Sequence, residues 1–259
     1  MDLGISGRKA IVCASSRGLG RACAFALAQA GCDVVVNGRD DKTVAATAEE
    51  LRLSTGANVT AVVADVATAQ GQAALLGACP EPDILVNNNA GPPFRDFREL
   101  TRPQMIDGVI ANMVVAIELT QKVIDSMCAK NFGRIVNITS GSVKMPLSGL
   151  DLSSGARAGL TAFLAGVARS VAASNVTINF LLPGAFDTER LASNMAMTAK
   201  KRGVSVEQAR KERMASVPAK RFGTPAEFGD ACAFLCSAQA GYITGQSLLI
   251  DGGIYPGVL

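Results

Sequence analysis

Short apolar segments that alternate with longer helical stretches are the feature of this sequence that most constrains its fold. The apolar segments are typical of buried strands and lie at residues 9–14, 33–37, 58–66, 83–87, 133–140, 175–182 and 245–253. Helical patterns separate them at residues 18–30, 41–53, 68–79, 103–130, 154–173 and 225–237. Strands that are apolar throughout and separated by helices favour a parallel sheet covered on both faces. With no linker and no internal repeat, we expect one α/β domain over residues 1–259.

The composition excludes several classes of function. The 259 residues carry a net charge of +3, which is too small to indicate a nucleic-acid-binding protein. The chain has no histidine, so it cannot form a Ser-His-Asp triad, and it lacks the commonest metal ligand. No charged-then-apolar leader opens the sequence, and no apolar run approaches the roughly 20 residues that span a bilayer. We expect a soluble cytoplasmic protein with no metal site and no membrane or nucleic-acid partner.

The seven cysteines give no sign of a metal or redox motif. None forms a C-x-x-C pair, and although Cys232 and Cys236 share a helix face, a zinc site would need further thiolates. We therefore expect buried, reduced thiols.

The first expected strand ends in a glycine-containing loop, "CASSRGLG" at residues 13–20. Ligands of parallel sheets bind at the carboxyl ends of the strands. Gly18 and Gly20 would leave the backbone bare at the positive end of the first helix, where a pyrophosphate can approach the amide groups. Glycine pairs also occur in plain turns, but the position between a strand and a helix favours a dinucleotide site.

The end of the second expected strand favours NADP(H) over NAD(H). An NAD site usually has an acidic residue here to bind the ribose hydroxyls. This chain has Asn37-Gly38-Arg39 instead, and Arg17 lies in the glycine loop. Guanidinium groups suit a 2′-phosphate, while Asp40 leaves the NAD alternative open.

Taken in order, several motifs along the whole chain resemble those of the short-chain dehydrogenase/reductase family, in its β-ketoacyl-carrier-protein reductase-like branch. They are "CASSRGLG", "ADV" (64–66), "NNAG" (88–91), Asn112, "NITS" (137–140), "PGAFDT" (183–188) and "YITGQSLLIDGG" (242–253). The resemblance implies a Rossmann-type, doubly wound, seven-stranded sheet and assembly into a homotetramer or dimer.

The resemblance also implies where the cofactor binds. Asp65 and Val66 match the adenine contact, "NNAG" matches the segment beside the adenosine ribose, and "PGAFDT" matches the nicotinamide side. The full expected set is Ser15, Ser16, Arg17, Gly18, Leu19, Gly20, Arg39, Asp65, Val66, Asn89, Ala90, Gly91, Pro183, Gly184 and Thr188. Two departures stand out: Ala14 replaces the first glycine of the loop, where its methyl group would crowd the turn, and an extra asparagine in "VNNNAG" leaves the register of residues 87–89 open by one.

The catalytic tetrad of the family is Asn, Ser, Tyr and Lys, and only half of it is present. Asn112 and Ser140 match the first two residues, whereas Ser153 and Arg157 occupy the tyrosine and lysine positions. A serine hydroxyl is a far weaker acid than a phenol, and an arginine stays charged at every working pH. We expect these four residues to form a modified site. Its proton would come from water held by Ser140 and Ser153, with Asp151 and Lys144 as the alternatives.

A change in composition indicates a substrate lid at about residues 188–221. Lysine and arginine outnumber acids by nine to three over 189–221, and residues 205–216 have the pattern of an amphipathic helix. Such a surface could receive an acyl carrier protein or coenzyme A, or it could be a solvated helix face. Met195, Met197 and Met214 could line an adaptable pocket or belong to the core.

Two functions remain open. The first is an NADP(H)-dependent oxidoreductase acting on a carbonyl or alcohol, 3-oxoacyl compounds included. The second is a catalytically weak or inactive dinucleotide-binding sensor or assembly protein, which the absent tyrosine and lysine favour.

Overall fold

A computed structural model describes residues 2–92 and 94–257 and shows a seven-stranded parallel sheet. The strand order is β3-β2-β1-β4-β5-β6-β7, so the predicted doubly wound, Rossmann-type α/β fold is confirmed. The strands are β1 (Lys9–Val12), β2 (Asp33–Gly38), β3 (Val59–Val63), β4 (Ile84–Asn87), β5 (Gly133–Ile138), β6 (Val176–Pro183) and β7 (Ser247–Ile250).

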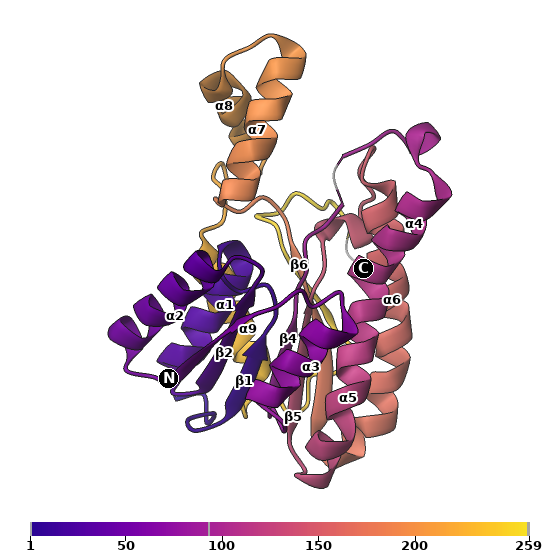
Figure 1. Ribbon diagram of the computed structural model, residues 1–259. Helices are drawn as coiled ribbons and strands as arrows, with labels where there is room; N and C mark the ends of the chain where they lie inside the picture. The colour runs from indigo at the N-terminus through magenta and orange to yellow at the C-terminus, as the bar shows by residue number, and fades with distance from the viewer. Residues whose placement is uncertain (1, 93, 258–259) are drawn as a thin grey trace.

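Helices cover both faces of the sheet (Figure 1). Successive residues of β1 divide between the two cores: Ala10 and Val12 face one and Ile11 faces the other, as does Cys13 just after the strand. The first face is covered by α1 (Gly18–Gln29), α2 (Asp41–Thr55) and α9 (Pro225–Cys236). The second is covered by α3 (Ala69–Ala78), α5 (Val115–Ala129) and α6 (Asp151–Val171). Burial on both faces explains why the strands are apolar throughout.

The helix predicted over 103–130 is interrupted in the middle, so that prediction is wrong in detail. It divides into α4 (Arg102–Val109), a π-helical segment over Ile110–Val114, and α5. A π-helical turn accommodates an extra residue within an otherwise regular helix, and hydrophobic period alone does not reveal it. Asn112 lies at the centre of this segment.

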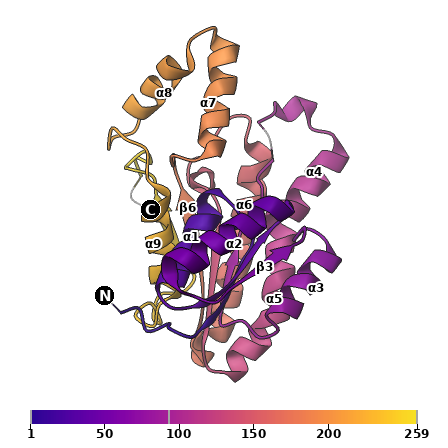
Figure 2. The same ribbon diagram turned by 60° about the vertical axis from the view of Figure 1, so that its left-hand side comes forward.

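A helical hairpin projects from the body of the molecule, as both views show (Figures 1 and 2). It consists of α7 (Glu189–Arg202) and α8 (Val206–Ala215), and the helix expected at 205–216 is therefore confirmed. An ion pair of 2.6 Å between Arg202 and Glu212 joins the two helices. Met195 is buried at the hairpin, whereas the side chain of Met197 is mostly exposed. Within the described residues, no helix combines the length and apolar character needed to cross a membrane.

Buried asparagines form a row across the middle of the sheet. Asn87 in β4 donates to the Oδ1 of Asn137 in β5, at 3.0 Å. Asn137 donates in turn to the backbone carbonyl of Asn179 in β6, at 3.3 Å, and Asn179 donates to that of Ile243, at 2.7 Å. These amide contacts tie together the three strands whose carboxyl ends lead into the candidate site.

The thiols are placed largely as predicted. All seven cysteines are free, and six of them are buried, while Cys128 is half-buried. Burial raises the pKa of Cys13 and Cys32 to about 12, which keeps both in the thiol form.

Candidate active site

The glycine loop is held from behind by the ends of β2 and β4. The Oγ of Ser15 donates to the carbonyl of Val12 at 2.6 Å and accepts from the amide of Asn37 at 2.9 Å. The Ala14 amide donates to the Asn37 Oδ1 at 3.0 Å, and the Ala14 carbonyl accepts from Asn88 at 3.1 Å. Ser15 is thus fully enclosed, so its side chain fixes the loop from the inner side.

The conformation of the loop explains two of its small residues. Ala14 adopts φ +45°, in the left-handed region that glycine occupies at lower cost. A Cβ on Gly20 would lie 2.5 Å from the Ala14 carbonyl oxygen, so the close approach of helix and loop requires glycine there. Gly18, at φ +60°, faces open space. The N-cap residue Arg17 makes no side-chain cap, which leaves the first amides of α1 open toward that space.

Two exposed arginines border the loop at the end of β2. Arg39 Nη1 lies 3.9 Å from an Asp65 carboxylate oxygen, and Arg17 Nη1 lies 3.8 Å from one of Glu189. Asp40, the acidic residue that left NAD binding as an alternative, serves as the N-cap of α2. Hydrogen bonds from the hydroxyl and amide of Thr43 hold the pKa of Asp40 below its usual value. The Asp40 carboxylate is therefore already used by its own helix.

The residues that follow β3 and β4 lie beside the loop. Asp65 is partly exposed, and its carboxylate also accepts from the amide of Ala67, whereas the side chain of Val66 is buried in the core. Asn89 donates to the carbonyl of Ala111 at 3.2 Å, which links the end of β4 to the π-helical segment. Its Oδ1 accepts from the amide of Ala90.

The loop after β6 completes this edge of the sheet. A Cβ on Gly184 would lie 2.6 Å from the Cα of Asp251, so glycine permits a close backbone contact. Pro183 ends β6, and the hydroxyl of Thr188 caps the first turn of α7. All the predicted cofactor positions are thus at or next to the carboxyl ends of the strands, and their contacts with a cofactor stay a prediction.

Asn112 and Ser140, the two residues that match the family tetrad, lie on different elements of the fold. Asn112 is buried in the π-helical segment, where its Nδ2 donates to the carbonyl of Gly108 at 3.0 Å. Its Oδ1 is enclosed and has no hydrogen-bond partner among the described residues. Ser140 begins the 3-10 turn that follows β5, and its Oγ accepts from the amide of Ser142 at 3.1 Å.

Ser153 and Arg157 lie one turn apart near the start of α6, and both are more than nine-tenths buried. Arg157 donates through Nε to the Oγ of Ser153 at 3.3 Å, and through Nη1 to the carbonyl of Ile138 at 2.7 Å. The second contact ties α6 to the end of β5, two residues before Ser140. Burial, together with the nearby charge of Arg190, lowers the pKa of Arg157 to about 10. Arg157 is therefore still a cation at neutral pH.

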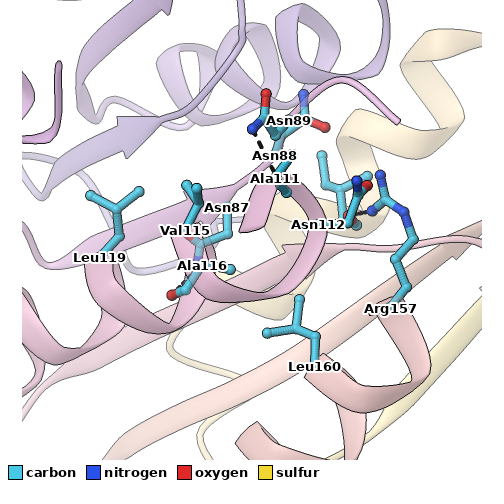
Figure 3. A pocket seen from close by; sticks show the side chains of 11 residues that line it. Asn87, Asn88, Asn89, Ala111, Asn112, Val115, Ala116, Leu119, Arg157 and Leu160 are labelled. Atoms are coloured by element: carbon cyan, nitrogen blue, oxygen red, sulfur yellow. Dashed lines mark hydrogen bonds between the residues drawn. The ribbon is translucent and has the colours of Figure 1, made fainter. Parts of the chain in front are cut away.

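Two cavities meet at this cluster. In Figure 3 the side chain of Arg157 rises from α6 toward the amide of Asn112, at a small cavity of about 20 Å³. A second cavity, of about 270 Å³, shares Asn112 with the first and is also lined by Ser153. Its other lining residues are Ala90, Gly91, Pro92, Arg95, Leu100, Gln104, Asp107, Gly108, Ala111, Gly149, Leu150 and Leu152. The larger cavity has room for a small substrate.

The tyrosines and the alternative proton donors lie elsewhere. Tyr242 is fully exposed, and Tyr255 lies under Lys144, whose Nζ is 5.7 Å from the ring centroid. Asp151 is exposed in the first turn of α6 and accepts from the amide of Gly149 at 3.2 Å. None of these four residues is among the described residues that line either cavity.

Sequence reasoning missed two charged residues that line the larger cavity and a third that packs behind its wall. Arg95 and Asp107 line it from a loop and a helix that carry no motif. The guanidinium of Arg190 packs on Gly91, with Nη2 only 2.9 Å from where a Cβ on that glycine would lie. Its position two residues after Thr188, in the expected nicotinamide loop, was the one available signal.

Comparison with known proteins agrees with this arrangement. Residues 13–255 match the family model described as enoyl-(acyl carrier protein) reductase. The chain belongs to the short-chain dehydrogenase/reductase family. Among its short-chain dehydrogenase/reductase relatives, the 3-oxoacyl-[acyl-carrier-protein] reductase FabG of Vibrio harveyi is 31% identical over 254 residues, covering 98% of this chain and 99% of FabG.

Solved structures of the short-chain dehydrogenase/reductase family show the same fold. L-sorbose reductase from Gluconobacter frateurii, solved with NADPH and L-sorbose, is 27% identical with a TM-score of 0.94, and the match covers 100% of both chains. YwfH, an NADPH-dependent reductase involved in bacilysin biosynthesis, is 28% identical with a TM-score of 0.92, covering 98% of this chain and 100% of YwfH.

Proposed function

We propose that this chain is an NADP(H)-dependent oxidoreductase that transfers hydride to or from a carbonyl or alcohol, with Ser153 and Arg157 in place of tyrosine and lysine. One observation carries the proposal. Buried Asn112 lines two adjoining cavities, one together with Arg157 and the other with Ser153, at the same edge of the sheet as an open glycine loop. Relatives that are reductases by name support the oxidoreductase class.

The residues present fit a dinucleotide, and NADP(H) is favoured over NAD(H). The uncapped first turn of α1 offers amides to the pyrophosphate, and Gly18 leaves space for it. Arg17 and Arg39 are exposed where a 2′-phosphate would lie, and Asp40 is engaged as a helix cap. YwfH is described as NADPH-dependent, and L-sorbose reductase was solved with NADPH.

The remaining cofactor contacts are those that the family resemblance implies. The pyrophosphate would be bordered by Ser16, Leu19 and Gly20, and the adenine by Asp65 and Val66. The ribose would be bordered by Asn89, Ala90 and Gly91. The nicotinamide would be bordered by Pro183, Gly184 and Thr188. Ser15 would act by holding the loop, because its hydroxyl is enclosed. Val66 would likewise contribute through its backbone, because its side chain is buried.

Hydride transfer at this site would depend on how the chain positions the substrate and stabilises its charge, more than on a side chain that donates a proton. The bound nicotinamide would supply or accept the hydride. Ser140 and Ser153 would donate hydrogen bonds to the substrate oxygen, and Arg157 would stabilise negative charge that develops there. Since no side chain lining the larger cavity is a phenol, lysine or histidine among the described residues, water would exchange the proton.

The second hypothesis, a dinucleotide-binding sensor or assembly protein, rests on the same substitution. General acid catalysis contributes roughly 10²–10⁴-fold to a rate, and its loss could leave a protein that binds NADPH without useful turnover. The missing tyrosine at Ser153 is the observation that favours it.

Oxidation of NADPH with a panel of β-ketoacyl, quinone, sugar and other small carbonyl compounds tests the two hypotheses. Turnover that falls in Ser140→Ala, with NADPH affinity by calorimetry unchanged, supports the enzyme. Tight NADPH binding without turnover on any carbonyl supports the sensor. No affinity for either nicotinamide dinucleotide would overturn both.

The hairpin and the exposed apolar residues support two further expectations. Residues 188–221, which include α7 and α8, would form a lid within a single domain and could receive an acyl carrier protein or coenzyme A. Exposed Ile106, Val109, Ile110 and Phe163 would be covered in a homotetramer or dimer. Sedimentation equilibrium would detect that assembly, and cell fractionation would test the expected cytoplasmic location.

A further inference from the structure

Arg157, which lines the smaller cavity, and Arg190, which packs on Gly91 at the edge of the larger one, have no carboxylate partner. Among the described residues, no aspartate or glutamate oxygen lies within ion-pair distance of either guanidinium. Arg157 is only 7% exposed, and a buried charge is costly unless it is paired or fully hydrogen-bonded. A bound anion would therefore offset the cost of burying the Arg157 charge.

Arg134 shows how this protein satisfies a buried guanidinium that has only a structural role. Its Nε donates to the carbonyl of Ser237 at 3.0 Å. Its Nη1 and Nη2 donate to the carbonyl and the Oδ1 of Asn175, at 2.8 and 3.2 Å. Arg157 is satisfied less well. Its Nε bond to a hydroxyl is long, and its Nη2 makes no hydrogen bond within residues 2–92 and 94–257. Arg157 thus retains donor capacity at the smaller cavity.

The second arginine lies directly behind a lining residue of the larger cavity. Arg190 packs on Gly91, which lines the larger cavity, and its charge is close enough to act on Arg157. Arg95 lines the cavity as well, and Asp107 is the acid that faces it. With Arg157 and Arg190 beside it, the cavity has an excess of positive charge. Two like charges held together are stabilised when an anion lies between them.

We propose that Arg157 and Arg190 bind the carboxylate of a small oxo acid or hydroxy acid where the two cavities adjoin, beside Ser153 and Gly91. The inference rests on the proposed function and names the substrate class of that site. In the reducing direction, hydride from NADPH would add to the carbonyl carbon and a proton from water to its oxygen, giving the hydroxy acid and NADP⁺, with the carboxylate unchanged. Because the Nε and Nη1 of Arg157 already donate to Ser153 and Ile138, its Nη2 would bind one carboxylate oxygen and Arg190 the other.

Matched substrates test the charge requirement. With NADPH, α-ketoisocaproate would be compared with its methyl ester and with methyl isobutyl ketone, which replaces the carboxylate by a methyl group. We expect kcat/KM to be at least about tenfold higher for the acid, because the charge-assisted hydrogen bonds to the carboxylate are lost in the others. Arg190→Gln would remove that preference by lowering kcat/KM for the acid toward the value for the ester. Equal rates for acid and ester, or an unaltered preference in Arg190→Gln, would overturn the proposal.

Lys201→Gln is the matched control, because it removes an exposed charge from the other end of α7. It should leave both substrates unaffected. If it lowers the acid preference as much as Arg190→Gln does, general attraction by the hairpin explains the effect and the specific site is excluded.

A binding experiment separates failure of the inference from failure of the proposed function. Calorimetry with oxamate, an unreactive analogue of an oxo acid, should show binding to the NADP⁺ complex that weakens at least about tenfold in Arg190→Gln and in Arg157→Gln. Circular dichroism would confirm that both variants are folded. Oxamate binding without turnover of any carbonyl would refute the oxidoreductase but support the anion site. Reduction of neutral ketones with no oxamate binding would refute the anion site alone, and so would competition between oxamate and NADP⁺.

Discussion

Arg157 donates through its Nε to the hydroxyl oxygen of Ser153, one turn earlier on α6, at 3.3 Å. The Ser153 oxygen accepts from a group that is always a donor near neutral pH, so the hydroxyl hydrogen is directed away from Arg157. Ser153 also lines the larger cavity, and its hydrogen can therefore be offered to a substrate oxygen. The pair supplies a hydrogen bond and a positive charge, but no acid that readily gives up a proton.

Restoring the family residues should raise reductase activity. The double variant Ser153→Tyr with Arg157→Lys would place a phenol beside an ammonium, which lowers the pKa of the phenol and supplies a proton. The cavity of about 270 Å³ beside Ser153 offers room for the ring. We expect kcat to increase at least about tenfold, within the range of general acid catalysis. Each single variant serves as a control, and an unchanged kcat with NADPH still bound would contradict this account of the proton.

The pH profile should differ from that of an enzyme with a titrating acid. The catalytic cluster has no group that titrates between about pH 6 and pH 9, so kcat should be nearly flat over that range. Arg157 acts as a cation, and burial lowers its pKa to about 10, so activity should fall as the pH rises through that value. Because burial favours the neutral form, deprotonation of Arg157 does not itself destabilise the fold. A bell-shaped profile centred near neutral pH, with intact circular dichroism, would reveal a proton donor outside this cluster.

Alanine substitution of Ser140 should lower activity, whereas the same substitution of Ser142, in the same turn, should not. Ser140→Ala removes a hydrogen bond to the substrate oxygen, and we expect kcat to fall roughly 10- to 100-fold with little change in NADPH affinity. Ser142→Ala is the matched control, because the Ser142 hydroxyl is buried with no partner among the described residues. That variant should keep full activity and gain up to about 1 kcal/mol in the free energy of unfolding by urea denaturation. Equal loss of activity in both would mean that the turn itself, rather than the Ser140 hydroxyl, is required.

Ala14→Gly should stabilise the protein. Ala14 is held at φ +45°, where a methyl group costs about 1–2 kcal/mol relative to glycine. The greater chain entropy of glycine in the unfolded state takes back part of the gain, so the net increase should be about 0.5–1 kcal/mol. Ala30→Gly provides the comparison, because Ala30 has an ordinary φ of −78° and should only lose stability. Thermal unfolding of the two variants measures the difference, and a loss in both would show that no strain is stored at Ala14.

Thiol reactivity should be confined to one residue. Six cysteines are buried, and burial raises the pKa of Cys13 and Cys32 to about 12, so few thiolates are present at neutral pH. Titration with Ellman's reagent should modify at most one thiol in the folded protein, Cys128, and all seven after denaturation. Cys128→Ser should lower the native count to zero, and rapid reaction of a second thiol would indicate that α1 or α9 opens locally.

The fold could be predicted almost completely, because burial on both faces leaves a direct mark on the sequence of each strand. Every expected strand is present, and most boundaries differ by a few residues. The π-helical segment was not predicted, since its residues have the same apolar spacing as the helices around it. The extra residue of this segment is recognised only in the structure, where the side chain of Asn112 is buried.

The candidate site could be predicted only where a motif carried it. Asn112, Ser153 and Arg157 are brought together as their order in the sequence suggested. Arg190 was missed because its role depends on contact with Gly91, roughly a hundred residues away in the chain. Arg95 and Asp107 were missed for a similar reason, since a cavity wall is assembled from segments that have no pattern in common.

The asparagine row has a consequence for how the central strands find their alignment. Ile84, Leu85 and Val86 of β4 and Ile135 and Val136 of β5 are so alike that hydrophobic burial alone would hardly distinguish correct pairing from a shifted one. A shift of one residue would turn Asn137 to the opposite face and leave the Asn87 amide without its partner in an apolar interior. The asparagine amides therefore select the correct strand register, because a shifted pairing would bury an unsatisfied amide, whereas the apolar side chains would pack almost equally well in either register.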